Sequence, residues 1–389
     1  MCLWVSETIL PKTELFPPES HFTNKISQTK ALFSRIRYPE KVSPEELDAY
    51  LAAGWRCMGQ AVYTSHFMFF GPEGGKRVYS TIPSRLPLEG FRFSRSQRRL
   101  WSKNDRAFRI EVGAPAKYDE AKQRVNRRYA GQFPRRAIRD AEDVLSNGKG
   151  RLALDTREVE IYDGATLAAF SFFDVGRQSM YSKQGIYDPA YQKYSLGFFT
   201  MLVEIGYALE RGLQYYYPGY VVPGNQEFDY KHRVGQLEYF ELKDGAWKPF
   251  RQLREEDIPI NYLRSRLEEL KGGLQALGIP CNTFDYRYFD IRFYDNRPFP
   301  FLEFPCFLLS GSRDKENLCP VAVFDPIQMA YHVYNCRIFG PGVEHLGAYR
   351  QALRALRPVF HNPVAVFDIL CESCGREETL DALAQFARD

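Results

Sequence analysis

Residues 158 to 217 carry the pattern that most limits what this chain can fold into. Two strand-like runs, Glu158–Tyr162 and Thr166–Phe173, lie on either side of Asp163-Gly164. Asp-Gly between such runs is typical of the tight turn of a β-hairpin, because glycine adopts positive φ without strain. An antiparallel hairpin is therefore expected here.

A loop, a helix and a strand are expected after the hairpin. The stretch from Gly176 to Ser195 is dense in Tyr, Ser and Gln and reads as irregular. Leu196–Arg211 has apolar residues at helical spacing, and Gly212 suits the position just beyond a helix end. A short aromatic strand is expected over Leu213–Tyr217. This order predicts an α/β or α+β fold with the start of the helix at the ligand edge.

Length and composition fit a folded chain of two or three domains. The chain has 389 residues, of which 44% are hydrophobic and 26% charged. We expect the segments 1–150, 151–255 and 256–389 to form separate units. Short strands are expected over 55–93, 282–293, 321–324 and 364–370, and further helices over 44–54, 117–129, 137–145, 262–277, 346–354 and 379–388.

No segment of the sequence is typical of a membrane span or a signal peptide. Glu204 breaks the longest apolar run before it reaches the roughly 18 residues that a span needs. The N-terminus lacks the basic start and long apolar core of a signal peptide. A cytoplasmic protein without membrane contact is therefore expected.

The eight cysteines do not form a disulfide scaffold pattern. Only Cys371 and Cys374 have metal-ligand spacing, and a zinc site needs a second pair of ligands nearby, which the sequence does not supply. We expect two reduced thiols at a strand end and no metal.

Positive charge is concentrated between Arg85 and Arg139, although the whole chain has a net charge of only +4. This stretch holds sixteen Arg and Lys and five Asp and Glu. Its densest part, Phe91–Asn104, interleaves Arg with Ser and aromatic residues, a composition suited to phosphate neutralisation and base stacking. A solvated basic face carries equal weight, and the stretch also fits an acidic protein partner.

Common catalytic motifs are absent, and hydroxyl groups gather instead in the middle segment. There is no nucleophile elbow, no phosphate-binding loop and no metalloprotease motif, and Tyr194-Ser195-Leu196-Gly197 lacks the repeated glycines of a coenzyme A cradle. Tyr and Ser bind ligands through neutral hydrogen bonds. Each Tyr alone more often belongs to the core, and an exposed helix position for Glu204 has about even weight.

Two ordered blocks of motifs lie across roughly residues 45–240. The first contains Gly54-Trp55-Arg56, Gly59, Tyr63, Arg77-Val78, Phe91, Ser94-Arg95-Ser96-Gln97-Arg98-Arg99 and Lys103-Asn104. The second contains Asp174, Ser179-Met180-Tyr181, Tyr187-Asp188-Pro189, Ser195-Leu196-Gly197, Glu204-Ile205, Tyr217-Pro218-Gly219-Tyr220 and Tyr230-Lys231. In these motifs the chain resembles the aminoacyl-tRNA–protein transferases of the N-degron pathway, which comprise arginyl transferases and bacterial leucyl transferases that act on N-terminal Asp or Glu.

The resemblance implies both a fold and a reaction. The fold is a GNAT-like (acetyltransferase-like) mixed sheet with flanking helices, preceded by a basic N-terminal domain and here followed by an extension of unknown role. The reaction is transfer of Arg or Leu from aminoacyl-tRNA to the N-terminal α-amine of an acceptor protein, a step toward protein degradation. Aminoacyl-tRNA replaces acetyl-coenzyme A as donor, and no cofactor is implied.

The chain also departs from the family pattern. Eukaryotic members carry cysteines near the N-terminus and after the Tyr63 position that are linked to an iron–sulfur cluster; here only Cys2 remains, so we expect no cluster. Cys57, Pro218 and Asn225 replace the second Arg, a Leu and a Cys of the family motifs. These changes leave room for altered substrate choice or for lost activity.

Site roles follow from residue chemistry at the positions that match the family. Catalytic roles are expected for Asp188, Glu204, Lys231 and Tyr187. Substrate binding is expected for Arg56, Arg77, Ser179, Tyr181, Ser195, Gly197, Tyr217, Tyr220 and Tyr230. Contacts to tRNA are expected for Arg92, Arg95, Arg98, Arg99 and Lys103. The alternatives are a non-catalytic RNA-binding relative, an acyl-coenzyme A-dependent acetyltransferase and an adaptor for acidic proteins.

Overall fold

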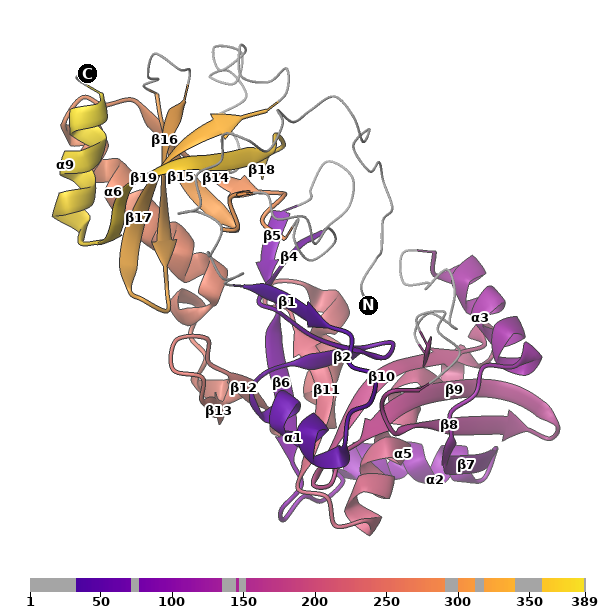
Figure 1. The fold of residues 1–389 in the computed structure, drawn as a ribbon. Coiled ribbons are helices and arrows are strands. Elements are labelled where there is room, and N and C mark those ends of the chain that lie inside the picture. Colours follow the sequence, from indigo (N-terminus) through magenta and orange to yellow (C-terminus); the bar gives the residue numbers. More distant parts are fainter. Residues whose placement is uncertain are drawn as a thin grey trace.

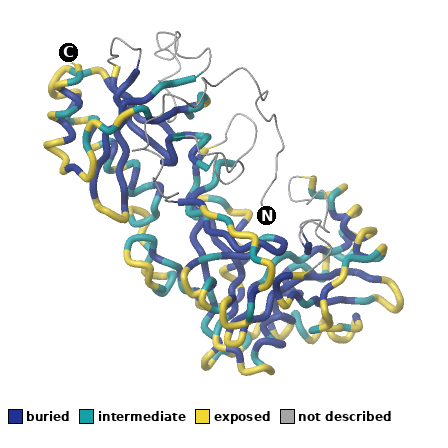
Figure 2. Tube along the Cα trace, viewed as in Figure 1, coloured by how far each residue is buried: buried dark blue, intermediate teal, exposed yellow. Residues whose placement is uncertain are grey.

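The computed structural model describes residues 33–70, 77–134, 145–146, 152–290, 300–311, 318–339 and 359–387. Two large sheets dominate these residues, and buried positions concentrate in their strands (Figure 2). The helices expected over 137–145 and 346–354 lie almost wholly outside the described residues. Within the described residues no helix is both long and apolar enough to cross a membrane.

The first large sheet has eight strands in the order β13-β12-β6-β11-β10-β9-β8-β7 (Figure 1). It is mixed, because β10 pairs antiparallel with β9 and parallel with β11. The strands are β6 (Ile82–Pro87), β7 (Arg109–Pro115), β8 (Thr156–Asp163), β9 (Thr166–Val175), β10 (Ser179–Tyr187), β11 (Tyr215–Val221), β12 (Glu238–Phe240) and β13 (Trp247–Pro249).

The predicted hairpin is confirmed, but the predicted irregular stretch after it is wrong in part. Strands β8 and β9 pair through a turn in which Gly164 has a φ of +57°. Residues 179–187 form β10 in the middle of the sheet. The sequence hid this strand because its polar residues meet buried polar partners from other elements, which a local pattern cannot show.

Helices cover both faces of this sheet. Helix α5 (Leu196–Glu210) packs on the face that carries Phe173 and Met180, and α2 (Arg95–Asp105) lies against α5. Helix α3 (Glu120–Gln132) packs on the opposite face, against Phe170 and Phe172. Because side chains alternate along a strand, Phe173 and Met180 lie on one face of the sheet and Phe170 and Phe172 on the other. The expected mixed sheet with flanking helices is thereby confirmed.

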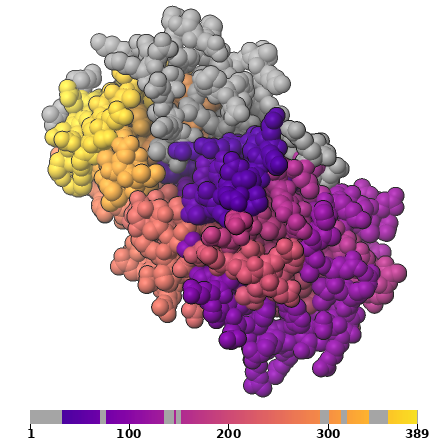
Figure 3. Space-filling view, turned by 60° about the horizontal axis from the view of Figure 1, so that its bottom comes forward, coloured from indigo at the N-terminus to yellow at the C-terminus, as the bar shows by residue number. Residues whose placement is uncertain are grey.

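A small three-stranded sheet and α1 also cover the α3 side. Its strands, in the order β1-β3-β2, are β1 (Ser34–Arg37), β2 (Arg56–Met58) and β3 (Ala61–Ser65). Helix α1 (Pro44–Ala52) begins as the sequence predicts, with Ser43 and Glu46 forming a capping box. Leu47 and Leu51 of α1 pack with Tyr181 and Tyr217 of the large sheet. In the space-filling view this indigo segment lies between the salmon-to-orange and magenta parts of the chain (Figure 3).

The second large sheet belongs to a C-terminal unit with the strand order β18-β14-β15-β16-β17-β19. Its strands are β14 (Cys281–Tyr286), β15 (Cys306–Ser310), β16 (Cys319–Asp325), β17 (Ala330–Ile338), β18 (Val359–Phe360) and β19 (Val364–Cys374). Helices α6 (Pro259–Ala276) and α9 (Arg376–Phe386) pack against it, close to the helices expected over 262–277 and 379–388. The strand expected over 282–293 ends at Tyr286.

The expected boundary at residue 150 does not separate two sheets. Strands β6 and β7 precede it and the other strands of the eight-stranded sheet follow it, and β7 pairs directly with β8. The unit after residue 255 likewise takes Phe33, Phe67 and Val78 into its core. Phe67 and Val78 come from β4 (Phe67–Phe70) and β5 (Arg77–Ser80), a strand pair that lies between the two large sheets (Figure 1).

Candidate active site

Strands β10 and β11 separate after a short stretch of parallel pairing. They pair only at Ser179 with Tyr215, Met180 with Tyr216 and Tyr181 with Tyr217. Immediately beyond, both strands have irregular registers with their other neighbours. The chain then leaves β10 through a 3-10 helix (Pro189–Tyr194) into α5. Because ligands of α/β folds bind beyond the carboxyl ends of parallel strands, this opening is the candidate site.

Glu204 lies buried on the α5 side of the opening. One carboxylate oxygen accepts a hydrogen bond from Ser171 Oγ at 2.6 Å, and the other accepts one from Tyr216 Oη at 2.7 Å. Ser182, half-buried at the start of the divergence, is close enough to Glu204 to lower its pKa. Burial raises the pKa of Glu204 to about 7, against the opposing effect of these hydrogen bonds. Glu204 is buried, so the alternative interpretation of Glu204 as an exposed helix residue is wrong.

A buried ion pair lies on the opposite side of β10. Lys183 Nζ is 2.8 Å from Asp174 Oδ1, and Thr156 Oγ1 donates to the same oxygen. Burial raises the pKa of Asp174, and the charge of Lys183 opposes this. The Cys57 thiol lies in the same pocket, where burial and then Asp174 raise its pKa well above the usual value. Cys57 is therefore not poised as a nucleophile.

Sequence reasoning missed Lys183. The residue is the extra one at the register shift between Ser182 and Gln184, and no local pattern marks such a bulge. The Asp174 position was noted in the motif series but received no role.

Two cations meet on the ring of Tyr220. The Arg56 guanidinium lies 4.4 Å from the ring centroid and the Lys231 ammonium 4.9 Å. Arg56 is 1% exposed and Lys231 7%. Lys231 Nζ also donates to the Tyr220 carbonyl oxygen at 2.8 Å. A Cβ placed on Gly219 would lie 3.2 Å from Lys231 Nζ and 3.7 Å from Tyr181 Oη, so a residue predicted to be catalytic and one predicted to bind substrate meet at this glycine.

The Arg56 guanidinium is incompletely satisfied within the described residues. Its Nη2 donates to the Ser65 carbonyl oxygen, whereas Nε and Nη1 are buried and have no hydrogen-bond partner there. Burial and the charges of Arg56 and Arg35 lower the pKa of nearby His66 to about 3. Unsatisfied buried donors are costly, and an anion would satisfy them. The arrangement therefore suits binding of a carboxylate.

Other predicted site residues have structural partners away from this cluster. Asp188 pairs with Arg128 and accepts a hydrogen bond from the Ala190 amide, so it begins the 3-10 helix. Ser179 Oγ donates to Asp48 of α1. Tyr217 stacks edge-on against Trp247 at 5.6 Å between ring centroids.

The remaining predicted residues line the entrance to α5 or lie near the edge of the cation cluster. Tyr187 packs against Tyr129, and a Cβ on Gly197 would come within 3.1 Å of the Tyr187 ring. Ser195 is exposed in a left-handed conformation with a φ of 52°. Arg77 is exposed with its guanidinium over Tyr79. Tyr230 is also exposed, and it adds slightly to the rise that burial and Glu204 cause in the pKa of Tyr216.

The predicted tRNA-binding residues gather on one helix and the segment before it. Arg95, Arg98, Arg99 and Lys103 lie on α2 and Arg92 just before it, and all five are exposed. Two α2 side chains hold this helix beside the entrance to α5: Lys103 Nζ donates to the Lys193 carbonyl oxygen at 2.9 Å, and Asn104 to that of Tyr194 at 3.0 Å. The basic helix therefore lies next to the candidate opening.

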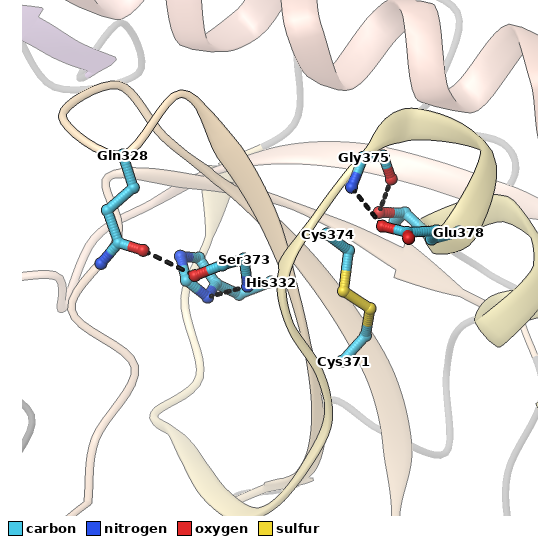
Figure 4. The surroundings of a disulfide bond; sticks show 8 residues. Gln328, His332, Cys371, Ser373, Cys374, Gly375 and Glu378 are labelled. Carbon is cyan, nitrogen blue, oxygen red and sulfur yellow. Dashed lines mark hydrogen bonds between the residues drawn. A yellow bond between two sulfur atoms is a disulfide. The ribbon is translucent and has the colours of Figure 1, made fainter.

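The expectation of two reduced thiols at Cys371 and Cys374 is wrong. The two residues form a disulfide at the end of β19 (Figure 4). A φ of +56° at Ser373 turns the chain there and brings the Cα atoms to 6.2 Å, which is within the range of disulfides. No group of three or more metal-ligating residues occurs in the parts of the chain that the structure describes.

Comparisons with known proteins point to one reaction class. A family model described as "Arginine-tRNA-protein transferase, C terminus" matches residues 111–241. The aspartate/glutamate leucyltransferase of Leptospira interrogans is 28% identical over 217 residues, which cover 54% of this chain and 79% of that protein. The enzyme of the same name from Nitrosococcus oceani is 27% identical over 246 residues, 60% of this chain and 91% of that protein.

Similarity to solved structures is weak. The C-terminal domain of a putative lysylphosphatidylglycerol synthetase from Agrobacterium fabrum is 12% identical, covers 40% of this chain and 49% of that chain, and has a TM-score of 0.31. A GCN5-related N-acetyltransferase from Kribbella flavida is 13% identical, covers 44% and 55%, and has a TM-score of 0.24. At these scores the similarity carries no argument about function.

Proposed function

We propose that this chain transfers leucine or arginine to acceptor proteins that begin with Asp or Glu. It belongs to the aminoacyl-tRNA–protein transferase family and is an enzyme of that class. The observation that carries the proposal is the pair of buried cations on the Tyr220 ring. Arg56 and Lys231 offer a carboxylate side chain a charged, largely desolvated site, and two Arg56 nitrogens lack other partners among the described residues. A forked guanidinium suits a carboxylate better than a point charge does.

The reaction is aminolysis of an ester. The acceptor α-amine attacks the ester carbonyl carbon of aminoacyl-tRNA, a C–N bond forms, and the C–O bond to the terminal ribose breaks. The acceptor starts as an α-ammonium, which gives one proton to a base before the attack. A second proton moves from the nitrogen to the ribose oxygen as that oxygen leaves, and the amide nitrogen keeps the third. Because an α-ammonium has a pKa of about 7.7–8.0, a weak base positioned at the site is sufficient.

Glu204 is the proposed acceptor of that proton, through Ser182. The Glu204 pKa of about 7 lies close to that of the amine, and Ser182, which lowers the pKa of this carboxylate, is half-buried at the opening. Tyr216, fixed by the same carboxylate, holds β11 in place. Asp188, in contrast, is engaged by Arg128 and is proposed only to shape the entrance to α5.

The donor is proposed to approach across α2. Exposed arginines on this helix suit the tRNA backbone, and the helix is fixed to the segment that leads into α5. The ester then reaches the opening between β10 and β11, where Tyr187 and Ser195 lie at the entrance and are proposed to hydrogen-bond the ester or the terminal adenosine.

A transfer assay tests the proposal. The protein is incubated with leucyl-tRNA or arginyl-tRNA and with peptides that begin with Asp, Glu, Arg or Ala, and the products are read by mass spectrometry. We expect the mass of one amino acid to be added to the Asp and Glu peptides only. Addition to Ala or Arg peptides would contradict the acidic acceptor, and tRNA binding without any transfer would favour a non-catalytic RNA-binding relative.

A further inference from the structure

The strand pair β4–β5 belongs to the cores of both halves of the molecule. Side chains alternate between the two faces of a strand. On one face, Phe67 and Val78 are buried in the core of the C-terminal unit. The Phe67 ring meets Phe289 of that unit edge-on, with 6.3 Å between centroids. This face anchors the strand pair to the C-terminal sheet.

The other face of the strand pair packs behind the cation site. Phe70 and Tyr79 pack against Tyr220 and Phe228, with 6.0 Å between the Phe70 and Phe228 centroids. Tyr220 and Phe228 are the two rings over which the Lys231 ammonium lies, at 4.9 and 5.6 Å. The position of β4–β5 therefore sets the position of these rings.

A forked ion pair fixes β5 to the C-terminal unit. Arg264 of α6 donates through Nε to Asp285 Oδ1 of β14 at 3.0 Å and through Nη2 to Oδ2. The same two side chains hold the backbone of Val78: its N–H donates to Asp285 Oδ2 at 3.3 Å, and its carbonyl accepts from Arg264 Nη2 at 3.1 Å. The Asp285 side chain is 2% exposed and that of Arg264 16%.

A second contact lies at the start of α6. The amide of Ile260, in the first turn of this helix, donates to Ser80 Oγ at the end of β5 at 2.9 Å. The free amides of a helix start need such acceptors. Both the middle and the end of β5 are thus held by side chains or amides of the C-terminal unit.

We propose that the C-terminal unit, residues 259–387, determines how tightly the acceptor binds, with Arg264 and Asp285 as positioning residues. Neither residue touches the acceptor site. They hold β5, β5 holds the rings of Tyr220 and Phe228, and the rings hold the Lys231 ammonium beside Arg56. The inference rests on the proposed function, because it assigns this cation site to the acidic acceptor residue.

Steady-state kinetics of the full chain test this inference. Arg264→Met should raise KM for an Asp-initiated peptide at least tenfold, while kcat and KM for aminoacyl-tRNA stay within twofold. Arg264→Lys keeps the charge but loses the fork, so it should give a smaller rise. The matched control is Arg266→Met on the same helix, whose partner Glu269 is exposed, and it should leave all three constants unchanged.

Hydrogen exchange gives a readout that does not depend on activity. In Arg264→Met and in the milder Asp285→Asn, amides of the peptide covering β5 should exchange faster, while those of β9 should not. If β5 exchanges faster and the peptide KM is unchanged, or if KM for aminoacyl-tRNA rises equally, the inference is overturned. If the unaltered chain transfers no amino acid to any peptide, the proposed function itself is wrong. That result is obtained before any variant is compared, so it is distinct from failure of this inference.

Discussion

Burial divides the polar residues near the opening by role. Lys231 and Arg56 are buried over the aromatic ring of Tyr220, and two Arg56 nitrogens have no hydrogen-bond partner among the described residues, whereas Lys183 is buried against Asp174. A buried cation with its own carboxylate stabilises the fold, whereas a buried guanidinium with unsatisfied donors, such as Arg56, can bind an anion.

Loss of Lys231 should weaken transfer to Asp-initiated acceptors without changing tRNA binding. Lys231→Ala removes one of the two cations on Tyr220, and we expect transfer to Asp peptides to fall at least tenfold with an unchanged Kd for tRNA. The control is Lys248→Ala, since Lys248 pairs with Asp244 at the surface. Peptide kinetics and tRNA titration measure the two quantities. Unchanged transfer would remove Lys231 from the site.

Glu204 should make stability fall as pH rises from about 4.5 to about 7. Its pKa is raised in the folded state, so the folded chain keeps a proton that the unfolded chain has lost, and unfolding is favoured with increasing pH. The effect is on the order of 3 kcal/mol. Glu204→Gln should therefore gain stability relative to the unaltered protein between pH 5 and pH 7.5 in urea unfolding. Equal pH dependence of the two proteins would exclude this titration.

At the scale of elements, α2 combines a buried and a charged face. Gln97 and Asn104 are its buried residues, and Trp101 packs on Phe199 with 5.6 Å between the rings. Gln97 Nε2 donates to the Arg233 and Val234 carbonyl oxygens, which ties the helix to the segment before β12. With this face packed, Arg95, Arg98 and Arg99 of α2 are exposed to solvent.

Exposed arginines of α2 should contribute additively to tRNA binding. Arg95→Ala and Arg99→Ala should each weaken binding of every tRNA and lower the slope of log K against log salt by about 1. Arg254→Ala is the control, because Arg254 is exposed but paired with Asp257. Filter binding at several salt concentrations gives both numbers. Slopes equal to that of the unaltered protein would place the tRNA elsewhere.

The turn between β19 and α9 should be oxidised in the isolated protein. Alkylation without a reductant should leave the peptide that contains Cys371 and Cys374 unmodified and lighter by two hydrogens, and alkylation after reduction should add two labels. Cys371→Ser is the control, since it frees Cys374 for labelling. Mass spectrometry of the digest measures the number of labels on this peptide. Two labels without reduction would contradict the disulfide.

At the scale of the whole molecule, the core of the C-terminal sheet includes residues from the beginning of the chain. Phe33 stacks edge-on with Phe67 and Phe304, at 5.1 and 5.5 Å between centroids. The C-terminal core is thus completed by residues that lie before the family match. The C-terminal unit is therefore not a contiguous range of residues, because its core includes Phe33, Phe67 and Val78.

A chain that ends at residue 257 should not fold normally. It would expose Phe33, Phe67 and Val78, which are buried by the C-terminal unit, at a cost of about 5 kcal/mol or more for three large apolar side chains. We expect insoluble protein or a Tm at least 10 °C lower by calorimetry. An intact Tm would show that the transferase half is independent.

The sequence predicted elements whose causes are local. The Asp-Gly turn, the capping box at Ser43 and the apolar spacing of α5 are each fixed by neighbouring residues, and each lies where expected. Strand β10 was missed, since a central strand takes its hydrogen bonds from β9 and β11 and its polar side chains from other elements. The disulfide was missed because the turn at Ser373 has no marker residue.

The sequence by itself determined the hairpin, the main helices, the basic stretch and the ordered motifs that indicate an aminoacyl transferase, because propensity, turn chemistry and charge act over a few residues. Only the tertiary structure decided that Arg56 and Lys231 share one ring, that Glu204 is buried beside Ser182, and that β4–β5 serves two cores. These facts depend on the pairing of distant segments, which local patterns do not encode.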